Sequence, residues 1–492
     1  MGFNLKELAR QNILSLTPYH CARDDFTEGI LLDANENTHG PASIDVLTEE
    51  EKKLSLNRYP DPNQVVLKQQ LCDFRNQEAS LPSSEIKVID ELKLKPENLC
   101  LGVGSDESID ALIRVFCKPG RDKMLVCPPT YGMYSICATV NDVEVVKCPL
   151  ELCNFQIQPK LIKELLTKDP FINLIYITTP GNPTAKKIEF DLIKELLNNE
   201  SWNGVVIADE AYIDFAPVGS SLAPLVNQYP NLVVLQTLSK SFGLAGIRLG
   251  ITFAHESISI LLNSMKYPYN ISNLTSDVAI RSTTFESIAK MRQNVNLILE
   301  NRSYVEKKLL ALDGMGKNIG GLDANFLLLQ VLDNNGKPSN IVAQAVYNKL
   351  AVEEQVVVRF RGNELGCTGC LRITIGTKEE NEILITKFKQ VLEQVLFNES
   401  KRKIGKMGKT EIGYSDQSYL PQSKIGKTEF GHSDGKLGKT ELGKTELGKT
   451  ELGKTEIGKT EIGKSQIGKT ELGKTEIGKT EFDKTDSNQK DK

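Results

Sequence analysis

The chain has 492 residues, a formal net charge of -4, 40% hydrophobic residues and 25% charged residues. This composition is typical of a globular protein, and without a basic excess nucleic acid is not an expected partner. No apolar run approaches the roughly 20 residues that a transmembrane helix requires, so we expect no membrane contact. The first residues lack the apolar segment of a signal peptide, and the ten cysteines are irregularly spaced, which together indicate reduced thiols and a cytoplasmic location.

Short apolar segments alternate with helical patterns through the first 400 residues. Segments such as "SIDALIRVF" and "FDLIKELLNN" have the apolar spacing of amphipathic helices. This alternation predicts an α/β fold with a mostly parallel sheet, in which ligands bind at the carboxyl ends of the strands. The predicted strands are 99–102, 124–127, 174–178, 205–208 and 232–235.

Polar residues follow the first three predicted strands. Ser105 and Asp106 come after the first strand, where a helix begins; its free amides suit a phosphate, although a plain helix cap explains the same residues. Tyr131 comes after the second strand and either stacks on a planar ligand or packs in the core. Asn182 comes after the third strand, in a turn that asparagine favours for its own reasons.

Charged residues follow the last two strands. Asp209 ends the fourth strand and Tyr212 comes three residues later, while Lys240 and Arg248 follow the fifth. A buried carboxylate or lysine is costly unless it is paired or neutralised. Pyridoxal 5′-phosphate has an aldehyde for a lysine, a ring nitrogen for a carboxylate, a ring oxygen for an amide and a phenol, and a phosphate for an arginine and a helix terminus. The combination predicts a site for this cofactor.

Longer motifs carry a family resemblance. The segments "NPTA" at Asn182, "DEAY" at Asp209 and "SKSFGLAGIRLG" at Ser239 resemble the fold-type-I pyridoxal-phosphate aminotransferases. Within that family, "TPYHCAR", "LDANEN", "NRYPDP", "CPPTYGMY" and "VVVRFRGNELGCTGCLRITIGT" resemble the histidinol-phosphate aminotransferases. The resemblance implies an aminotransferase region over 1–400. It divides into a large cofactor domain at 60–270 and a small α/β domain made of the N-terminal segment and 275–400.

The resemblance also implies roles at the cofactor. Lys240 would bind the cofactor covalently and move a proton, and Asp209 would pair with the ring nitrogen. Tyr212 and Asn182 would bind the ring oxygen, and Tyr131 would stack on the ring. The remaining predicted cofactor residues would hold the phosphate; they are Ser105, Asp106, Ser239, Arg248 and, from a neighbouring subunit of a homodimer, Tyr59.

Substrate binding is implied in the same way. Arg372 would bind the carboxylate of glutamate or 2-oxoglutarate, and Arg359, with Tyr19 and Asn35, would bind the phosphate of histidinol phosphate. The alternatives are a threonine-phosphate decarboxylase-like enzyme, an aminotransferase for another amino acid, and a non-catalytic cofactor-binding regulator. The last would need a separate DNA-binding domain, whereas the catalytic pattern starts within the first residues and the appended tail has no basic excess.

Two patterns point to other functions. Residues 401–492 contain a five-residue repeat, in which "GKTELGKT" matches a phosphate-binding loop but has no strand and helix around it. A period of five forms no apolar face, so we expect this tail to be disordered, with an interaction segment as the alternative. The C-x-x-C of Cys367 and Cys370 is typical of zinc or redox sites, but the four histidines are scattered, so we expect incidental thiols and no metal.

Overall fold

The computed structural model describes residues 2–18 and 47–407, and of residues 402–407 the backbone alone. The predicted substrate residues Tyr19 and Asn35 lie outside the described residues, as do residues 408–492 of the predicted tail. The expectation that disorder starts at residue 401 is wrong for residues 401–407, which continue a helix.

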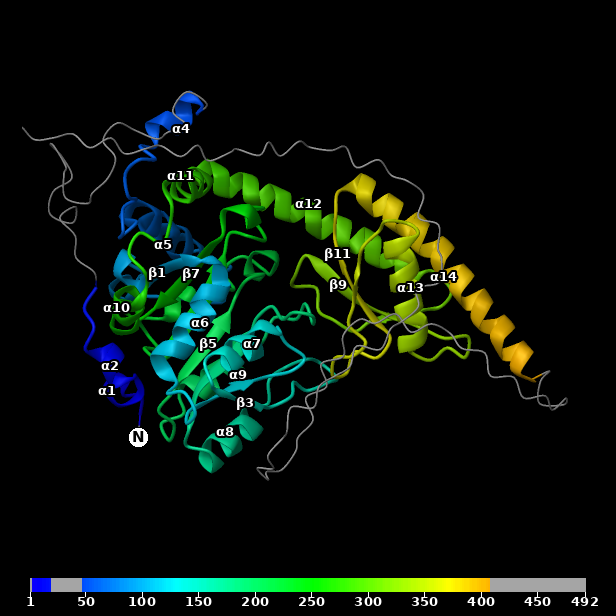
Figure 1. Ribbon diagram of the computed structural model, residues 1–492, viewed down its shortest axis with the longest axis horizontal. Helices are drawn as coiled ribbons and strands as arrows, with labels where there is room; N and C mark the ends of the chain where they lie inside the picture. The colour runs from blue at the N-terminus through cyan, green and yellow to red at the C-terminus, as the bar shows by residue number, and fades with distance from the viewer. Residues whose placement is uncertain (1, 19–46, 408–492) are drawn as a thin grey trace, which may run out of the picture. The chain divides into compact units, whose positions relative to one another are not determined.

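A seven-stranded sheet forms the centre of the larger part of the described chain (Figure 1). Its order is β1-β7-β6-β5-β4-β2-β3, with β7 antiparallel to both neighbours and the remaining pairs parallel. The strands are β1 (Leu99–Val103), β2 (Lys123–Val126), β3 (Glu144–Lys147), β4 (Ile172–Thr178), β5 (Val205–Asp209), β6 (Leu232–Thr237) and β7 (Leu249–Ala254).

All five predicted strands are confirmed, with ends that agree within two residues. The sequence did not reveal β3 and β7. The edge strand β3 reads "EVVK" and has no fully buried residue, so it lacks the apolar run of the central strands. β7 has no α-helix between it and β6, because it returns antiparallel between β1 and β6; only the 3₁₀ turn η6 (Ala245–Ile247) precedes it.

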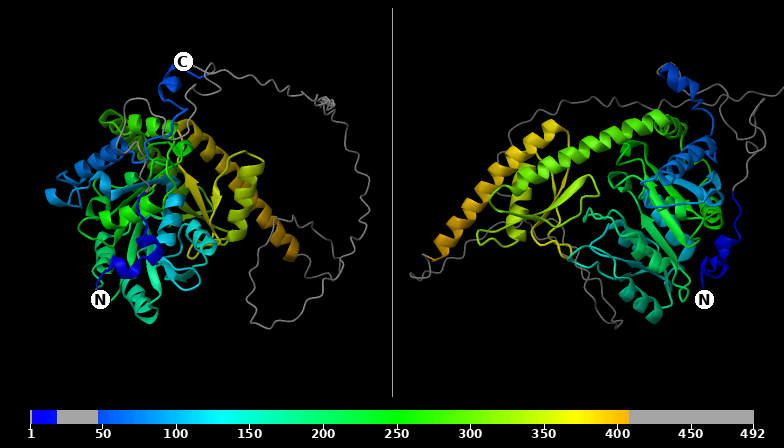
Figure 2. Two further views of the ribbon diagram at one scale, coloured as in Figure 1. Left: turned by 60° about the vertical axis from the view of Figure 1, so that its left-hand side comes forward. Right: turned by 180° about the vertical axis from the view of Figure 1, so that it is seen from behind.

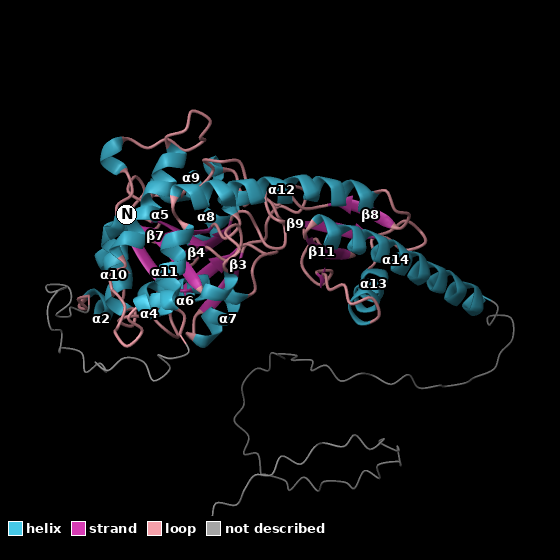
Figure 3. Cartoon of the chain, turned by 90° about the horizontal axis from the view of Figure 1, so that it is seen from above, coloured by secondary structure: helices cyan, strands magenta, loops and turns pink. Residues whose placement is uncertain are grey.

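Helices cover both faces of this sheet, which explains why its central strands are largely apolar. Alternate strand residues point to opposite sides. Val206, Ala208 and Val234 pack with α5, α8 and α9 on one side. Ile207 and Leu235 pack with α6, α7 and α10 on the other side. Figure 3 shows the strands enclosed between these helices, as a doubly wound fold requires.

The helices of this part are α5 (Val65–Ala79), α6 (Gly104–Phe116), α7 (Met133–Val140), α8 (Pro159–Lys168), α9 (Phe190–Leu197), α10 (Glu256–Met265) and α11 (Asn273–Ser282). Shorter helices are α1 (Leu5–Leu8), α2 (Gln11–Leu14), α4 (Glu49–Lys53), and the 3₁₀ turns η2 (Asp90–Leu92), η3 (Pro96–Asn98), η4 (Ile213–Phe215), η5 (Ala223–Leu225) and η6 (Ala245–Ile247).

A smaller antiparallel sheet, of order β10-β11-β9-β8, follows in sequence. One of its faces packs against α12, α13 and α14 through Leu329, Leu371 and Ile373. From behind, α14 lies beside α12 and α13 (Figure 2). The elements are α12 (Phe285–Leu310), β8 (Met315–Asn318), β9 (Phe326–Val331), α13 (Asn340–Val352), β10 (Arg359–Phe360), β11 (Cys370–Thr374) and α14 (Lys378–Met407).

The other face of the smaller sheet meets the larger part of the chain. Phe326 packs with Ala185 and Tyr212, so β9 lies against segments that follow β4 and β5. The N-terminal segment was expected to belong to the small domain. In the structure, Leu8 and Ile13 of this segment pack into the core of the larger sheet, beside α6 and α10. The domain division itself stays a prediction.

Candidate active site

A cavity of about 150 Å³ lies at the carboxyl edge of the larger sheet. Each strand beside it delivers a side chain, because parallel strands end on the same edge. All nine cofactor residues predicted from this chain's own strand ends line it: Ser105, Asp106, Tyr131, Asn182, Asp209, Tyr212, Ser239, Lys240 and Arg248.

Asp209, the last residue of β5, is 3% exposed. Its Oδ2 accepts a hydrogen bond from the Tyr134 hydroxyl at 2.6 Å, and its Oδ1 accepts one from the Ala211 N–H at 3.2 Å. Both donors are neutral, and burial raises the pKa of this carboxyl group. A cation beside Asp209 would offset its burial, and the protonated ring nitrogen of pyridoxal phosphate is such a cation.

Lys240 enters the cavity from the segment after β6. Burial lowers the pKa of its amine, and the positive charges of Arg372 and Arg248 lower it further. A lowered pKa increases the fraction of neutral amine, which is the nucleophilic form that attacks an aldehyde. The Lys240 Nζ lies 5.7 Å from the centroid of the Tyr212 ring.

The amino end of α6 and Arg248 form a cradle. Gly104, the first residue of α6, has φ +76°, and a Cβ there would lie 2.5 Å from the Arg248 Nη2. Only glycine therefore lets the guanidinium lie over the start of the helix. The same Nη2 is 3.9 Å from Asp106 Oδ2, and Ser239 Oγ nearby accepts a hydrogen bond from Thr237 at 2.9 Å. Helix amides and a guanidinium together suit a phosphate.

Aromatic rings and an amide complete the cavity. The Tyr131 hydroxyl donates to Asp106 Oδ1 at 3.3 Å, and its ring meets Tyr134 edge-on with centroids 5.6 Å apart. Burial raises the pKa of the Tyr212 hydroxyl, so this phenol stays protonated and can donate a hydrogen bond. Asn182 Oδ1 accepts a hydrogen bond from Arg372 Nη1 at 2.6 Å.

Arg372 connects the smaller sheet to this site. It lies on β11 directly opposite Arg359 of β10, on the face turned away from the helices. Like charges facing each other across two strands are destabilising. Burial and then the charge of Arg361 lower the pKa of Arg372, whose Nε is buried without a hydrogen-bond partner among the described residues. An anionic group bound here would offset the repulsion between the arginines and would accept a hydrogen bond from the Arg372 Nε.

Two predicted residues lie away from the Lys240 cavity. Arg359 is exposed and lines, with Arg372, a separate groove beside it. Tyr59 is half-exposed and stacks on Tyr269 with ring centroids 4.6 Å apart. Neither lines the cavity of its own chain.

Tyr134, Thr178 and Thr237 are site residues that the sequence reasoning missed. Tyr134 is fully buried, and its hydroxyl joins Asp209 to Thr178 Oγ1, which is 2.8 Å away. Thr237 ends β6, and its hydroxyl is hydrogen-bonded to Ser239 and to the Leu249 carbonyl. Thr178 and Thr237 could have been predicted, because each ends a strand at the carboxyl edge of the sheet. Tyr134, the second tyrosine of "YGMY", could not, because in the sequence it resembles an ordinary helical core residue.

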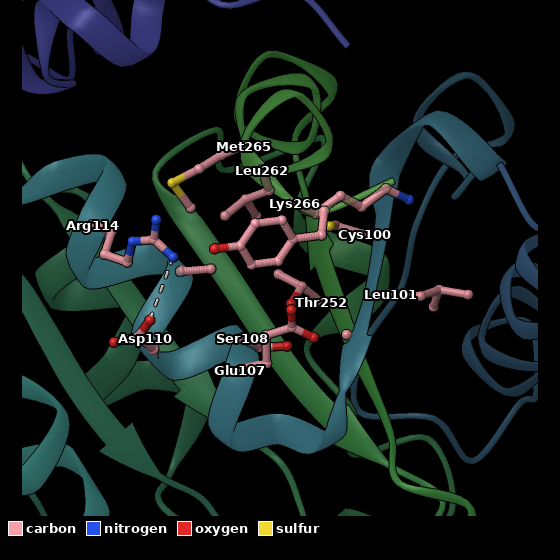
Figure 4. A pocket seen from close by; sticks show the side chains of 13 residues that line it. Cys100, Leu101, Glu107, Ser108, Asp110, Arg114, Thr252, Leu262, Met265 and Lys266 are labelled. Atoms are coloured by element: carbon pink, nitrogen blue, oxygen red, sulfur yellow. Dashed lines mark ion pairs between the residues drawn. The ribbon is translucent and has the colours of Figure 1, made fainter. Parts of the chain in front are cut away.

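A second, smaller cavity, of about 40 Å³, lies between α6, α10 and the middle of β1 (Figure 4). Asp110 and Arg114 of α6 form an ion pair at 3.8 Å there, opposite Leu262 and Met265 of α10. Lys266 donates to the Pro62 carbonyl at 2.9 Å. The charged groups named here are paired with each other or with a backbone carbonyl, and Leu262 and Met265 are apolar. This cavity therefore offers no set of reactive side chains like that around Lys240.

The part of the chain that the structure describes has neither a cluster of metal ligands nor a membrane-spanning helix. Within the described ranges, no three His, Cys, Asp or Glu side chains come together as metal ligands. Cys367 and Cys370 are free and fully buried, and they pack with Leu328. The described helices include none with the length and apolar character needed to cross a bilayer.

The fold and this group of residues define a pyridoxal-phosphate-dependent aminotransferase of fold type I. A family model described as aminotransferase class I and II matches residues 27–388. The histidinol-phosphate aminotransferase of Candida maltosa is 58% identical over 397 residues, covering 80% of this chain and 99% of the relative. That of Saccharomyces cerevisiae is 52% identical, covering 80% and 98%. The chain belongs to the histidinol-phosphate aminotransferase family.

Solved structures agree on the fold. The histidinol-phosphate aminotransferase of Sinorhizobium meliloti, solved in complex with pyridoxal 5′-phosphate, has a TM-score of 0.59 and 18% identity and covers 78% of this chain and 97% of its own. At this identity the likeness concerns the fold alone.

Proposed function

We propose that the protein transfers the amino group of L-histidinol phosphate to 2-oxoglutarate. The products are imidazole-acetol phosphate and L-glutamate, and the reaction belongs to histidine biosynthesis. The observation that carries this assignment is the 58% identity to a histidinol-phosphate aminotransferase over 99% of its length. The nine predicted cofactor residues that line the Lys240 cavity support the same chemistry.

The chain's own groups have distinct roles in this proposal. When bound, pyridoxal phosphate delocalises the negative charge that develops on the substrate carbon. Asp209 keeps the ring nitrogen protonated, while Asn182 and Tyr212 hydrogen-bond the ring oxygen. Lys240 holds the cofactor until substrate arrives, and its freed Nζ then takes the proton from the amino-bearing carbon. One cavity serves both substrates in turn, which implies ping-pong kinetics.

Arginines distinguish the two substrates in this proposal. Arg372 binds the carboxylate of glutamate or 2-oxoglutarate, and Arg359 binds the phosphate of histidinol phosphate. The support is that Arg359 and Arg372 are register partners on β10 and β11, and an anion would relieve the repulsion between these like charges. Tyr19 and Asn35 stay predicted helpers at the phosphate.

A homodimer and a cytoplasmic location complete the proposal. Tyr59 is 51% exposed and does not line its own chain's cavity, which supports a role at the cofactor phosphate of a second copy. The nine cysteines in the described part of the chain are free, which supports a reducing compartment. The partners are small-molecule substrates.

Product analysis separates this reaction from decarboxylation of a phosphorylated amino acid. Purified protein loaded with cofactor is mixed with L-histidinol phosphate, and 2-oxoglutarate is then added. We expect the aminated cofactor form first and stoichiometric glutamate afterwards. A parallel sample receives L-threonine phosphate. Release of carbon dioxide from threonine phosphate, with no glutamate formed from histidinol phosphate, would overturn the assignment.

A further inference from the structure

A buried cluster of charges lies beside the cofactor cavity and is not used by the mechanism above. Arg75 of α5 donates to Glu78 at 2.7 Å and to Asp214 Oδ1 at 2.9 Å. Arg292 of α12 donates to the Asp214 carbonyl at 3.0 Å and also pairs with Glu78. Arg75, Glu78 and Asp214 are all buried. Two cations therefore face two carboxylates, and the cluster is electrically balanced.

This cluster is joined to the lysine segment by one hydroxyl group. Ser241, the residue after Lys240, donates from its Oγ to Asp214 Oδ2 at 2.5 Å. Ser241 is itself buried at 8% exposure, so water does not compete strongly for this hydrogen bond. Asp214 lies on η4, two residues after Tyr212, so the same carboxylate also belongs to the turn that carries a predicted cofactor residue.

The lysine segment needs such an anchor. Pairing of β6 with β7 ends at Thr237, opposite Gly250, so Lys240 lies beyond the last ladder position. Its backbone carbonyl accepts one turn hydrogen bond, from the Gly243 N–H at 3.2 Å. A buried, paired carboxylate is a strong fixed point, because displacing it would leave the charges of its buried partners uncompensated.

We propose that Asp214, held by Arg75 and Arg292, is a positioning residue that fixes the Lys240 amine in the cofactor cavity through the hydroxyl of Ser241. The inference rests on the proposed role of Lys240. Its consequence is that loss of the Ser241 hydroxyl changes the environment of Lys240 more than it changes overall stability. The groups that face Lys240 directly remain in place; they are Arg372, Arg248, Asp106, Asp209 and the ring of Tyr212.

Ser241→Ala in the cofactor-loaded protein is the test, with Ser84→Ala as a matched control. Ser84 is a buried serine whose Oγ donates to the carbonyls of Ile86 and Gly219, and it does not line the cavity. The first readout is the midpoint of the pH titration of the bound cofactor's absorbance, which needs no substrate. The others are kcat, KM and the melting temperature. Ser241→Thr, which keeps the hydroxyl, is the conservative variant.

We expect Ser241→Ala to shift the titration midpoint and to lower kcat by about tenfold or more with a smaller change in KM, because misplacement of a reacting group is costly. Ser241→Thr recovers toward the parent values. Ser84→Ala loses similar thermal stability but keeps midpoint and kcat. If Ser241→Ala behaves like Ser84→Ala, the proposal is overturned. If the parent protein makes no product from histidinol phosphate, the proposed function fails, yet the absorbance titration still tests the positioning.

Discussion

At the residue scale, Asp209 combines burial with two neutral hydrogen-bond donors. The Tyr134 hydroxyl opposes the effect of burial on the Asp209 pKa, since a hydrogen bond to the charged form favours that form. The Tyr134 hydrogen bond therefore favours the charged carboxylate, which lines the cavity and can pair with a cation there.

Substitutions of Asp209 and Tyr134 test the contribution of the charge and of the hydrogen bond separately. Asp209→Asn keeps the shape but removes the charge, and we expect kcat to fall by about 10²-fold or more, as for loss of a preorganised electrostatic group. Tyr134→Phe removes one hydrogen bond, and we expect a loss of about tenfold. Stopped-flow measurement of the first half-reaction gives both values. A larger effect of Tyr134→Phe than of Asp209→Asn would contradict the assignment.

Glu210, the next residue, gives a prediction on pH. Burial raises the pKa of this carboxyl group to about 7, from an ordinary value of 4.5. The folded protein then binds more protons than the unfolded chain between these values, so this group's contribution is fully present below pH 4.5 and is lost as the pH rises through about 7. Urea unfolding at several pH values should show a decline in stability over this window that Glu210→Gln reduces. An unchanged pH dependence in Glu210→Gln would show that the carboxyl does not titrate there.

At the element scale, the start of α6 sets the shape of the phosphate cradle. Gly104→Ala would place a methyl group 2.5 Å from Arg248 Nη2 and would also strain a backbone with φ +76°. We expect cofactor affinity to fall by about tenfold or more, because a displaced guanidinium loses a charge-assisted hydrogen bond. Equilibrium binding of pyridoxal phosphate to the apoprotein measures this loss.

Gly336→Ala separates strain from displacement of Arg248. Gly336 has φ +72°, close to that of Gly104, but a Cβ there meets nothing within 4 Å. We expect this variant to lose some stability and to keep its cofactor affinity. Equal loss of affinity in both variants would mean that backbone strain, and not the cradle, explains the effect.

At the scale of the whole molecule, the repeat follows the catalytic part in the sequence. The repeat carries none of the predicted site residues, and α14 ends at Met407. We expect removal of residues 408–492 to leave kcat and KM within about twofold, since an appendage without a core-forming pattern makes few packed contacts. Steady-state kinetics of a folded truncation checks this, and a large loss of activity would show that the repeat takes part in catalysis.

Shared sites are the second prediction at this scale. Lys240→Ala subunits are mixed with Tyr59→Ala subunits and allowed to exchange. If Tyr59 serves the neighbouring site of a two-fold dimer, each mixed dimer has one site with both defects and one intact site. We expect activity to rise well above that of either variant alone. No rise, although subunit exchange is demonstrated, would place Tyr59 in its own subunit's site or in none.

The sequence by itself determined the α/β fold of the larger part and nine cavity residues. This was possible because strand periodicity is local and parallel strands end on a common edge, so a residue's place just after a strand also fixes its place in space. Asp209 at the end of β5 and Lys240 shortly after β6 are the clearest cases.

Only the tertiary structure decided the contacts between distant segments. Tyr134 meets Asp209 across 75 positions, Arg75 meets Asp214 across 139, and Arg372 meets Asn182 across 190. No local pattern encodes such pairs, because they arise when separately formed elements pack together and the polar groups buried between them form hydrogen bonds or ion pairs. The smaller sheet brings Arg372 to the cofactor edge for that reason, although its strands contribute nothing to the larger sheet.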